Sequence, residues 1–398
     1  MDITIFPKKL SGTVTAIPSK SQAHRLLICA AFSDSPTSIF CQSTNRDIEA
    51  TADCLRSLGA KIFRTKDTYE VIPIFQKPKK AVLNCHESGS TLRFMLPIVG
   101  ALGVDADFKM SGRLPKRPLS PLWEEMERMG CNLTRPNDNI IHLTGKLNPG
   151  TYTIDGSISS QFITGLLFAL ALLDEKSKLN ITGKIESKPY IDITKQCLAN
   201  FGVSTKEDTI QGGKAFISPG KVLVEGDWSN GAFFLAAKEL GSSVLISGLN
   251  SASYQGDKAC IPHFSQLSEN IWIDAADIPD LVPILAIVAG ANKGATFKNV
   301  ARLRTKESDR VSSVAAMLNK LGAQTEVSEN VLTVYPCIYK SCTIDACNDH
   351  RIAMSAAIAA TIATGPVTIL GAECVSKSYP TFWDDYKKLG GNYEQHIR

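Results

Sequence analysis

The sequence lacks the long apolar runs and the leader that would mark a membrane or secreted protein. Its longest apolar stretches, at 166–173 and 281–289, are shorter than the about 20 residues that a bilayer-spanning helix needs. The first residues show no basic region followed by an apolar core and a small-residue cleavage site, so they do not predict secretion. We therefore expect a soluble, cytoplasmic protein with no membrane partner.

Paired cysteines are also lacking. Eleven cysteines lie between Cys29 and Cys374, an odd number, and no two have the C-x-x-C spacing of a zinc ribbon. Three of them, Cys337, Cys342 and Cys347, recur at five-residue steps, which matches no common ligand pattern. We expect reduced thiols that belong to the core, and no metal site.

The common nucleotide and hydrolase signatures are missing. No two glycines are separated by a single residue, which excludes G-x-G-x-x-G, and the P-loop, H-E-x-x-H and G-x-S-x-G motifs do not occur. The net charge of 43 − 39 = +4 is too small by itself to indicate a nucleic-acid groove. We therefore expect neither a dinucleotide site nor a nucleic-acid partner.

What the sequence does have is a repeat. Apolar helical segments end in a glycine, which adopts the left-handed conformation past a helix end without strain, and an extended stretch follows. The gaps between these glycines are 71, 72, 120 and 68 residues, and the long gap closes if a degenerate copy ends near Asn270. Six copies of about 66 residues would fill the chain and predict stacked α/β units, although L-x-x-L-G is also a common helix ending. The glycines are Gly59, Gly130, Gly202, Gly322 and Gly390.

Between the glycines, strand-like and helix-like segments alternate, which indicates an α/β or α+β protein. Hydrophobic residues make up 44% of the 398 residues, enough for two or three domains with sizeable cores. The best candidate boundary is 220–226, where the second trio of repeats begins. The strand-like runs are AVLNC, TYTID, VLVEG, ATFKNV and VTILG, and the helix-like runs are SQAHRLLICAAF, SSQFITGLLFALALL, SNGAFFLAAKEL and HRIAMSAAIAATIA.

Seven loops rich in Lys, Arg, Ser and Gly adjoin predicted helix starts, where the helix dipole and free N–H groups favour anions. Each loop alone is weak evidence for an anion site, because one basic residue is more often a solvated surface charge and Ser-Ser is more often an N-cap. Their recurrence in successive repeats would place equivalent loops on one face and gather eight cations suited to polyanionic small molecules. These cations are Lys20, Arg25, Arg93, Arg117, Lys306, Arg310, Arg351 and Lys377.

Several short motifs follow one another between Lys20 and Lys377. In order they are S-K-S-x-x-H-R, S-G-S-T-x-R, K-R-P, S-S-Q, S-K-P-Y-I-D-I-T, I-P-D, K-E-S-D-R, N-D-H-R and S-K-S-Y-P. In these motifs and their order the chain resembles the 5-enolpyruvylshikimate-3-phosphate (EPSP) synthases. The resemblance implies two similar domains, each of three βαβαββ units around a pseudo-threefold axis. One domain would comprise 1–17 plus 226–398 and the other 18–225, with the active-site cleft between them and a hinge near Ile17 and Glu225.

The resemblance implies transfer of the enolpyruvyl group of phosphoenolpyruvate to the 5-hydroxyl of shikimate 3-phosphate, with release of phosphate. It implies no cofactor and no metal. The enol ether carbon becomes electrophilic only when its methylene is protonated, so an acid, a base and cations for the departing phosphate are required. We expect a monomer whose partners are these two small molecules, and a domain closure when their phosphates neutralise the cations.

Family roles carry over to matching positions. Asp280 is implied as the base and Glu307 as the acid that protonates the methylene. Lys20 or Lys377 would assist phosphate departure. Shikimate 3-phosphate would contact Ser21, Arg25, Ser159, Ser160, Gln161, Ser187, Tyr190 and Lys306. Phosphoenolpyruvate would contact Lys20, Gly89, Arg117, Gln161, Arg310, Arg351 and Lys377.

Simpler roles stay open for several acidic residues. Glu307 and Asp309 would pair with Lys306 and Arg310 on one helix if they served only its stability. Asp349 and His350 would then cap the next helix and support Arg351. These alternatives differ from the catalytic interpretation in where the carboxylates point.

Three positions depart from the family pattern. Glu87 stands where many relatives have Asn, and its carboxylate would repel anions unless it turns away or pairs with a cation such as Arg93. Arg302 stands where Asn is common, and Asn230-Gly231 replaces a small-hydroxyl pair. These departures concern affinity more than the type of reaction.

Three other functions remain as alternatives. A sister enzyme that acts on UDP-N-acetylglucosamine typically carries a reactive cysteine on a mobile loop, but 111–122 contains none. An RNA-terminal phosphate cyclase would need ATP and a nucleophilic histidine that we cannot place. A non-catalytic anion-binding module is disfavoured by Asp280 and Glu307, since anion binding alone would be stronger without carboxylates.

Overall fold

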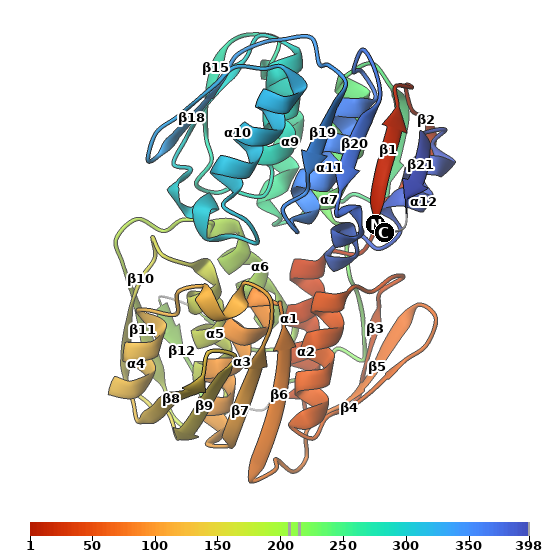
Figure 1. Cartoon of the computed structure of the whole chain (residues 1–398). Coiled ribbons are helices and arrows are strands. Elements are labelled where there is room, and N and C mark those ends of the chain that lie inside the picture. Colours follow the sequence, from red (N-terminus) through yellow and green to blue (C-terminus); the bar gives the residue numbers. More distant parts are fainter. Residues whose placement is uncertain (206–207, 214–215, 397–398) are drawn as a thin grey trace. The chain divides into compact units, whose positions relative to one another are not determined.

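The computed structural model describes residues 1–205, 208–213 and 216–396. The chain divides into two compact units, unit 1 with Met1–Ile17 and Glu225–Arg398, and unit 2 with Pro18–Val224. Glu225, which the sequence prediction assigned to the other domain, groups with unit 1. Within the described residues each unit contains three sheets (Figure 1).

Unit 2 alternates strands and helices along its length. In order, its elements are α1 (Lys20–Ala31), β3 (Thr37–Phe40), α2 (Arg46–Ser57), β4 (Lys61–Arg64), β5 (Thr68–Ile72), β6 (Lys80–His86), α3 (Gly89–Leu102), β7 (Asp105–Met110), η1 (Leu114–Lys116), α4 (Leu122–Arg128), β8 (Cys131–Asn137), β9 (Ile140–Gly145), β10 (Thr151–Asp155), α5 (Ser160–Ala171), β11 (Ser177–Thr182), α6 (Lys188–Asn200), β12 (Thr209–Ile210) and β13 (Lys221–Leu223).

Unit 1 begins with the N-terminal strands and resumes after unit 2. Its elements are β1 (Asp2–Phe6), β2 (Ser11–Thr15), α7 (Trp228–Glu239), β14 (Ser243–Ser247), η3 (Gly256–Ala259), α8 (Cys260–Gln266), β15 (Ile271–Asp274), α9 (Val282–Ala291), β16 (Ala295–Lys298), η4 (Ala301–Thr305), α10 (Arg310–Leu321), β17 (Thr325–Val327), β18 (Val331–Val334), β19 (Cys342–Asp345), α11 (His350–Ala360), β20 (Val367–Leu370), η5 (Ala372–Lys377), α12 (Phe382–Lys388) and β21 (Asn392–His396).

One sheet pattern recurs in both units. The sheet β6-β7-β9-β8 joins a parallel pair, β6 and β7, to two antiparallel strands, and β15-β16-β18-β17 repeats this order. Because a parallel pair needs a crossover helix, α3 connects β6 to β7 and α9 connects β15 to β16. The copies are therefore βαβαββ units, which confirms the predicted fold class.

The N-terminal strand completes a sheet formed by the C-terminal segment. In β1, Ile3 is opposite Ile369 of β20 on one side and Gln395 of β21 on the other, and both pairings are antiparallel. Strand β2 runs parallel to β14. The chain thus begins in unit 1, continues through unit 2 and returns.

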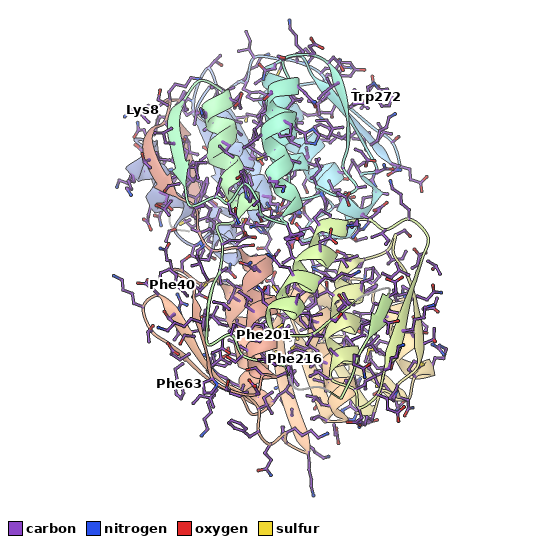
Figure 2. All side chains as sticks on the ribbon, turned by 180° about the vertical axis from the view of Figure 1, so that it is seen from behind. Lys8, Phe40, Phe63, Phe201, Phe216 and Trp272 are labelled. Carbon is purple, nitrogen blue, oxygen red and sulfur yellow. The ribbon has the colours of Figure 1, made fainter. Side chains whose placement is uncertain are left out.

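Buried helices pack against one another within each unit. All eleven residues of α11 are buried, and in unit 1 the helices α7, α9 and α11 contact one another (Figure 1). A helix that is apolar on all sides is stable only when other elements surround it. In unit 2, Phe201 and Phe216 are buried, whereas Phe40 and Phe63 are exposed (Figure 2). No helix among the described residues is long and apolar enough to span a bilayer.

The five helix-ending glycines have positive φ angles between 76° and 111°, so the predicted caps are confirmed. The sixth cap is wrong. Helix α8 ends at Gln266, and Asn270 does not have a positive φ but directly precedes β15.

The expectation that the thiols belong to the core holds for most cysteines, but Cys337 and Cys342 are half-buried and Cys347 is exposed in a turn.

Candidate active site

The start of α1 in unit 2 carries two of the predicted cations. Arg25 is buried and donates to the Thr194 hydroxyl at 2.8 Å, to the Tyr190 carbonyl at 3.0 Å and to the Ser21 carbonyl at 2.6 Å. Burial lowers the pKa of Arg25 to about 10, so the guanidinium stays charged at neutral pH. Arg25 therefore also holds α1 against the first turn of α6.

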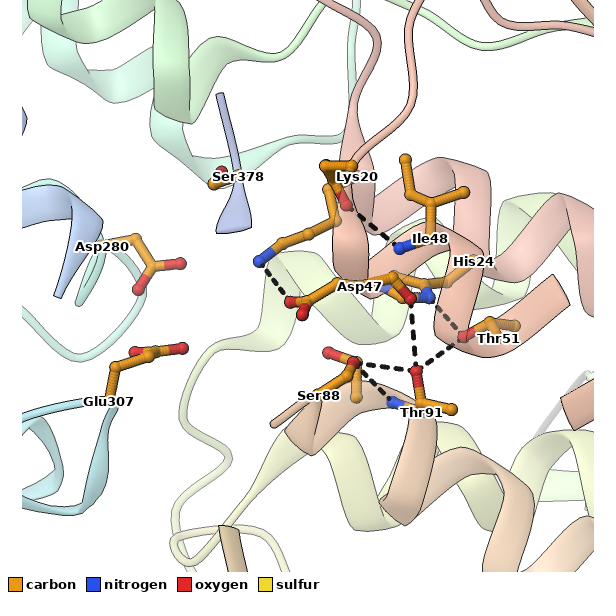
Figure 3. A network of polar contacts seen from close by, with 12 residues as sticks. Lys20, His24, Asp47, Ile48, Thr51, Ser88, Thr91, Asp280, Glu307 and Ser378 are labelled. Atoms are coloured by element: carbon orange, nitrogen blue, oxygen red, sulfur yellow. Dashed lines mark hydrogen bonds and ion pairs between the residues drawn. The ribbon is translucent and has the colours of Figure 1, made fainter. Parts of the chain in front are cut away.

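Lys20, the first residue of α1, pairs with a carboxylate that the sequence did not identify. Its Nζ lies 3.0 Å from Oδ2 of Asp47, in the first turn of α2 (Figure 3). No local sequence signal connects two residues 27 positions apart, so this pair could be found only in the folded chain. Lys20 is half-buried, which leaves its ammonium able to bind an anion as well.

The starts of α3 and α5 are tied together through polar side chains. Arg93 donates to Oε1 of Gln161 and to the Pro118 carbonyl, both at 3.0 Å, and Gln161 Nε2 donates to the Ser90 hydroxyl at 3.0 Å. These bonds orient the Gln161 amide. Arg93, which the sequence counted only among the cations, thus positions a predicted substrate ligand.

Gly89 begins α3 beneath two guanidinium groups. A Cβ at this position would lie 2.5 Å from Nη1 of Arg117 and 2.8 Å from Nη1 of Arg93. Only glycine allows the main chain and both cations to approach this closely. Gly89 and Arg117, two predicted phosphoenolpyruvate ligands, therefore lie together.

The predicted serines stand at two helix starts in unit 2. Ser159 is the N-cap of α5 and accepts a hydrogen bond from the Gln161 N–H at 3.3 Å, as the simpler N-cap interpretation expected. Ser160 is buried beside it. Ser187 is the N-cap of α6, is buried, and has a left-handed backbone with φ of 56°. Tyr190 follows in the first turn of α6.

In unit 1, Arg310 is surrounded by three carboxylates. Its Nε lies 2.8 Å from Asp349, its Nη1 2.6 Å from Asp280 and its Nη2 2.6 Å from Glu307, and its side chain is 1% exposed. Burial lowers the pKa of Arg310, but the three carboxylates outweigh burial and raise it overall. Arg310 is therefore a permanent cation that fixes the positions of Asp280 and Glu307.

Asp280 itself contacts two further cations. Its Oδ2 lies 3.2 Å from Nη2 of Arg351, and its Oδ1 lies 3.5 Å from Nζ of Lys306. Burial lowers the pKa of Lys306 to about 8, although Asp280 partly opposes this shift. Lys306 is thus the cation of this cluster that titrates in an accessible pH range.

The simpler interpretations of the other acidic residues are resolved. Glu307 precedes α10 instead of lying on it, and it pairs with Arg310. Asp309 caps α10 by accepting from the Ser312 N–H at 3.2 Å and pairs with Arg304 at 3.2 Å, so its predicted pairing within the helix is wrong. Asp349 caps α11 through the Arg351 N–H at 3.0 Å, as predicted.

Lys377 is the last residue of η5, and its Nζ donates to the Asn348 carbonyl at 3.0 Å. Asn348 directly precedes Asp349, the N-cap of α11. The ammonium therefore lies beside the start of α11, the helix that carries Arg351 in its first turn.

A buried carboxyl that the sequence did not identify adjoins the Arg310 cluster. Asp257, in η3, is 4% exposed, and its Oδ1 accepts no hydrogen bond from the described residues. Burial and the Asp280 charge raise the pKa of Asp257 to about 7, and Arg351 opposes the shift. Asp257 follows a turn and lies 23 residues before Asp280 in the sequence. No motif surrounds it, so the sequence does not mark it as a site residue.

The three departures from the family pattern are placed as follows. The side chain of Glu87 lies against Gly112, where an added Cβ would be 2.5 Å from the Glu87 Cδ. Asn230 is buried; its backbone N–H donates to the Asp227 carboxylate, which caps α7, and its side-chain amide donates to the Ser378 hydroxyl at 3.0 Å. Arg302 is in the short helix η4, half-buried.

Comparisons with known proteins agree with one another. A family model described as EPSP synthase (3-phosphoshikimate 1-carboxyvinyltransferase) matches residues 6–271 and 266–386. The chain is 38% identical to the 3-phosphoshikimate 1-carboxyvinyltransferase of Clostridium beijerinckii, over 99% of this chain and 98% of that protein. It is 39% identical to the protein of the same name from Clostridium perfringens, over 98% of each.

Solved structures show the same fold. An EPSP synthase from Acinetobacter baumannii superposes with a TM-score of 0.82 at 23% identity and covers 99% of both chains. The enolpyruvyl transferase NikO from Streptomyces tendae superposes with a TM-score of 0.77 at 18% identity, over 100% of this chain and 99% of that one.

Proposed function

This chain belongs to the EPSP synthase family, the 3-phosphoshikimate 1-carboxyvinyltransferases, and from this premise we propose how its own residues carry out the reaction. The enzyme transfers the enolpyruvyl group of phosphoenolpyruvate to the 5-hydroxyl of shikimate 3-phosphate and releases phosphate. The clusters of unit 1 and unit 2 then serve the same pair of substrates, which together carry two phosphates and two carboxylates.

In the addition step, the 5-hydroxyl oxygen bonds to C2 of phosphoenolpyruvate while its methylene C3 gains a proton. Asp280 accepts the proton that the hydroxyl loses, and Glu307 donates the proton that C3 gains. The product is a tetrahedral ketal with the phosphate still attached. Both carboxylates bind the one Arg310 guanidinium at 2.6 Å, so a base and an acid stand on either side of a fixed cation.

In the elimination step, the methyl group returns its proton to Glu307 and the C2–O bond to phosphate breaks. The departing phosphate carries the developing charge, which Lys20, Arg117, Arg310, Arg351 and Lys377 stabilise. Lys20 also assists departure by donating to the phosphate oxygen. Gln161 and the backbone at Gly89 complete the phosphoenolpyruvate contacts.

Shikimate 3-phosphate binds through hydroxyls and cations at helix starts. Ser21 and Arg25 hold its carboxylate, Ser159, Ser160 and Ser187 its phosphate, and Gln161 and Tyr190 its ring, while Lys306 contacts it from unit 1. Support comes from the serines, because Ser21, Ser159, Ser160 and Ser187 lie at the starts of α1, α5 and α6, where free N–H groups favour a phosphate.

The buried Arg310 with its three carboxylates is the observation that carries the proposal. A module that only bound anions would gain nothing from Asp280 and Glu307, which compete with the ligand for Arg310, whereas acid-base chemistry requires them. The names of the curated relatives support shikimate 3-phosphate over a nucleotide sugar as the acceptor. We also propose that the protein is a cytoplasmic monomer and that its domains close when the substrates bind.

The test is release of inorganic phosphate from phosphoenolpyruvate, measured with shikimate 3-phosphate and, in parallel, with UDP-N-acetylglucosamine. We expect release only with shikimate 3-phosphate. Release with the nucleotide sugar alone would identify the sister activity, and no release with either would refute the proposed function.

A further inference from the structure

A chain of four buried polar side chains links α1, α2 and α3 in unit 2 (Figure 3). His24 Nδ1 lies 2.7 Å from the Thr51 hydroxyl, which lies 2.8 Å from the Thr91 hydroxyl, which in turn donates to the Ser88 hydroxyl at 2.8 Å. All four side chains are 1% exposed or less. We call this set the His24–Ser88 chain.

The His24–Ser88 chain has one direction of donation. The single hydroxyl proton of Thr91 points to Ser88, with the Asp47 carbonyl as a weaker acceptor at 3.4 Å. Thr91 must then accept from Thr51, and Thr51 must accept from Nδ1–H of His24. The opposite direction would place a hydrogen on Nε2 of His24, which is buried without a hydrogen-bond partner, and an orphaned buried N–H is costly.

His24 stays neutral in this chain. Burial lowers its pKa well below the ordinary value, and the charges of Lys20 and Arg25 lower it further. Its ring meets the edge of Phe94 at 6.2 Å, so the side chain is enclosed by apolar and hydroxyl groups. The hydrogen bonds of the His24–Ser88 chain therefore keep one direction across the working pH range.

The His24–Ser88 chain reaches groups of the proposed site at Ser88 and at Thr91. Ser88 is the N-cap of α3 and accepts from the Thr91 N–H at 3.3 Å, so it fixes the first turn that contains Gly89. The Thr91 hydroxyl shares its proton weakly with the Asp47 carbonyl at 3.4 Å, and the Asp47 carboxylate binds Lys20 at 3.0 Å. His24 lies four residues after Lys20 and thus on the same face of α1.

We propose that the His24–Ser88 chain is a positioning element that holds Lys20, through Asp47, and the first turn of α3 in the arrangement that binds phosphoenolpyruvate. This inference rests on the proposed role of Lys20. Arg25 is held separately by Thr164, Thr194 and Tyr190, so the chain should not govern shikimate 3-phosphate binding.

The first test replaces Thr91 by valine, which keeps the shape and removes the hydroxyl. We expect kcat/KM for phosphoenolpyruvate to fall about ten-fold, mainly through KM, because one hydrogen bond is worth about that factor. KM for shikimate 3-phosphate should stay within about two-fold. The matched control is Thr37→Val, which removes another buried threonine hydroxyl of unit 2, 2.7 Å from Ser218, and should leave both KM values unchanged.

A second pair of variants tests the direction of the chain and covers the case in which Thr91→Val does not fold. In His24→Asn the amide N–H can replace Nδ1–H, whereas His24→Leu has no donor. We expect His24→Asn to stay within about three-fold of the parent and His24→Leu to repeat the loss seen in Thr91→Val. Equal losses in the two histidine variants would overturn the proposed direction.

Lys20→Met separates the two proposals. If Thr91 acts in part through Lys20, Thr91→Val should lower kcat/KM less in the Lys20→Met background than in the parent, whereas fully additive losses would overturn the role of the His24–Ser88 chain in holding Lys20. If Lys20→Met is impaired but Thr91→Val and His24→Leu behave like Thr37→Val, the chain inference fails and the function stands. If Lys20→Met is fully active, the proposed role of Lys20 fails, and the inference fails with it.

Discussion

Arg310 organises the charged residues of unit 1 because one buried guanidinium satisfies three carboxylates. Its fork geometry fixes the directions in which Asp280 and Glu307 point, which a lysine in the same place would not do. A substrate phosphate that binds Arg310 would compete with these carboxylates and alter their proton affinity. Under the proposed function, the acid and the base would thereby be coupled to ligand binding.

Shape-conserving variants test the acid and the base. We predict that Asp280→Asn and Glu307→Gln each lower turnover by about 100-fold or more, because proton transfer is lost while the hydrogen bonds to Arg310 are largely retained. The dissociation constant of shikimate 3-phosphate, measured by calorimetry, should change little. Undiminished turnover in both variants would remove the acid-base assignment.

Lys306 should produce a pH dependence on the alkaline side. Its pKa is lowered to about 8, mainly by burial, so it loses its proton as the pH rises through that value. Below pH 8 the cation is present and binds the anionic substrate, and above pH 8 it is lost. We predict that kcat/KM for shikimate 3-phosphate declines above about pH 8 and that Lys306→Arg moves the decline to higher pH. An identical profile in the arginine variant would exclude Lys306 as the titrating group.

At the residue scale the sequence located the basic residues and one of their partners, Glu307 for Arg310, but not the others. Lys20, Arg310 and Arg351 stand out through motifs, whereas Asp47 and Asp257 carry no motif and adjoin the site only through tertiary contacts. The predicted ion pair of Asp309 within the helix was wrong because α10 begins at Arg310, so that Asp309 is its N-cap.

At the scale of elements, helix starts carry the predicted anion-binding groups. Helices α1, α3, α5, α6, α10 and α11 each begin within one turn of a predicted ligand. Their N-termini contribute free N–H groups and partial positive charge in addition to the side chains. The position of each ligand therefore depends on how closely its helix packs against the next.

The contact between α3 and α5 gives a prediction about packing. A Cβ at Gly165 would overlap the carbonyl oxygen of Arg93 and lie 2.8 Å from Cγ of Pro97, so Gly165→Ala must push the helices apart. We predict a loss of about 1–3 kcal/mol in the free energy of unfolding. The matched control Gly231→Ala, in α7, meets only the end of the Leu249 side chain at 3.2 Å. Equal melting temperatures for the two variants would contradict the predicted close packing.

Apolar periodicity and glycine caps predicted the elements well because both are local. The runs at 160–171 and 350–360 are helices that are buried along almost their whole length, and the five glycines end helices as expected. The sixth cap was misplaced because Asn adopts a left-handed backbone less readily than Gly does. Helix α8 ends at Gln266, before Asn270.

At the scale of the molecule, a repeated βαβαββ pattern builds two units from one chain. The sequence predicted six copies of the repeat from spacing, but the grouping of 1–17 with 226–398 came only from the family resemblance, and the pairing of β1 with β20 and β21 was not predicted. Strand pairing across more than 360 residues leaves no local signal. The hinge near Ile17 and Glu225 stays a prediction.

The claim that both units serve one reaction is tested most directly by kcat/KM for phosphoenolpyruvate, measured by phosphate release in two matched lysine variants. Lys20→Met removes a cation from unit 2 and Lys377→Met removes one from unit 1, while Lys80→Met removes an exposed lysine as a control. We predict that each of the first two variants loses about 100-fold or more and that the control is unchanged. Full activity in either Lys20→Met or Lys377→Met would contradict the account, because the cations of one unit would then suffice.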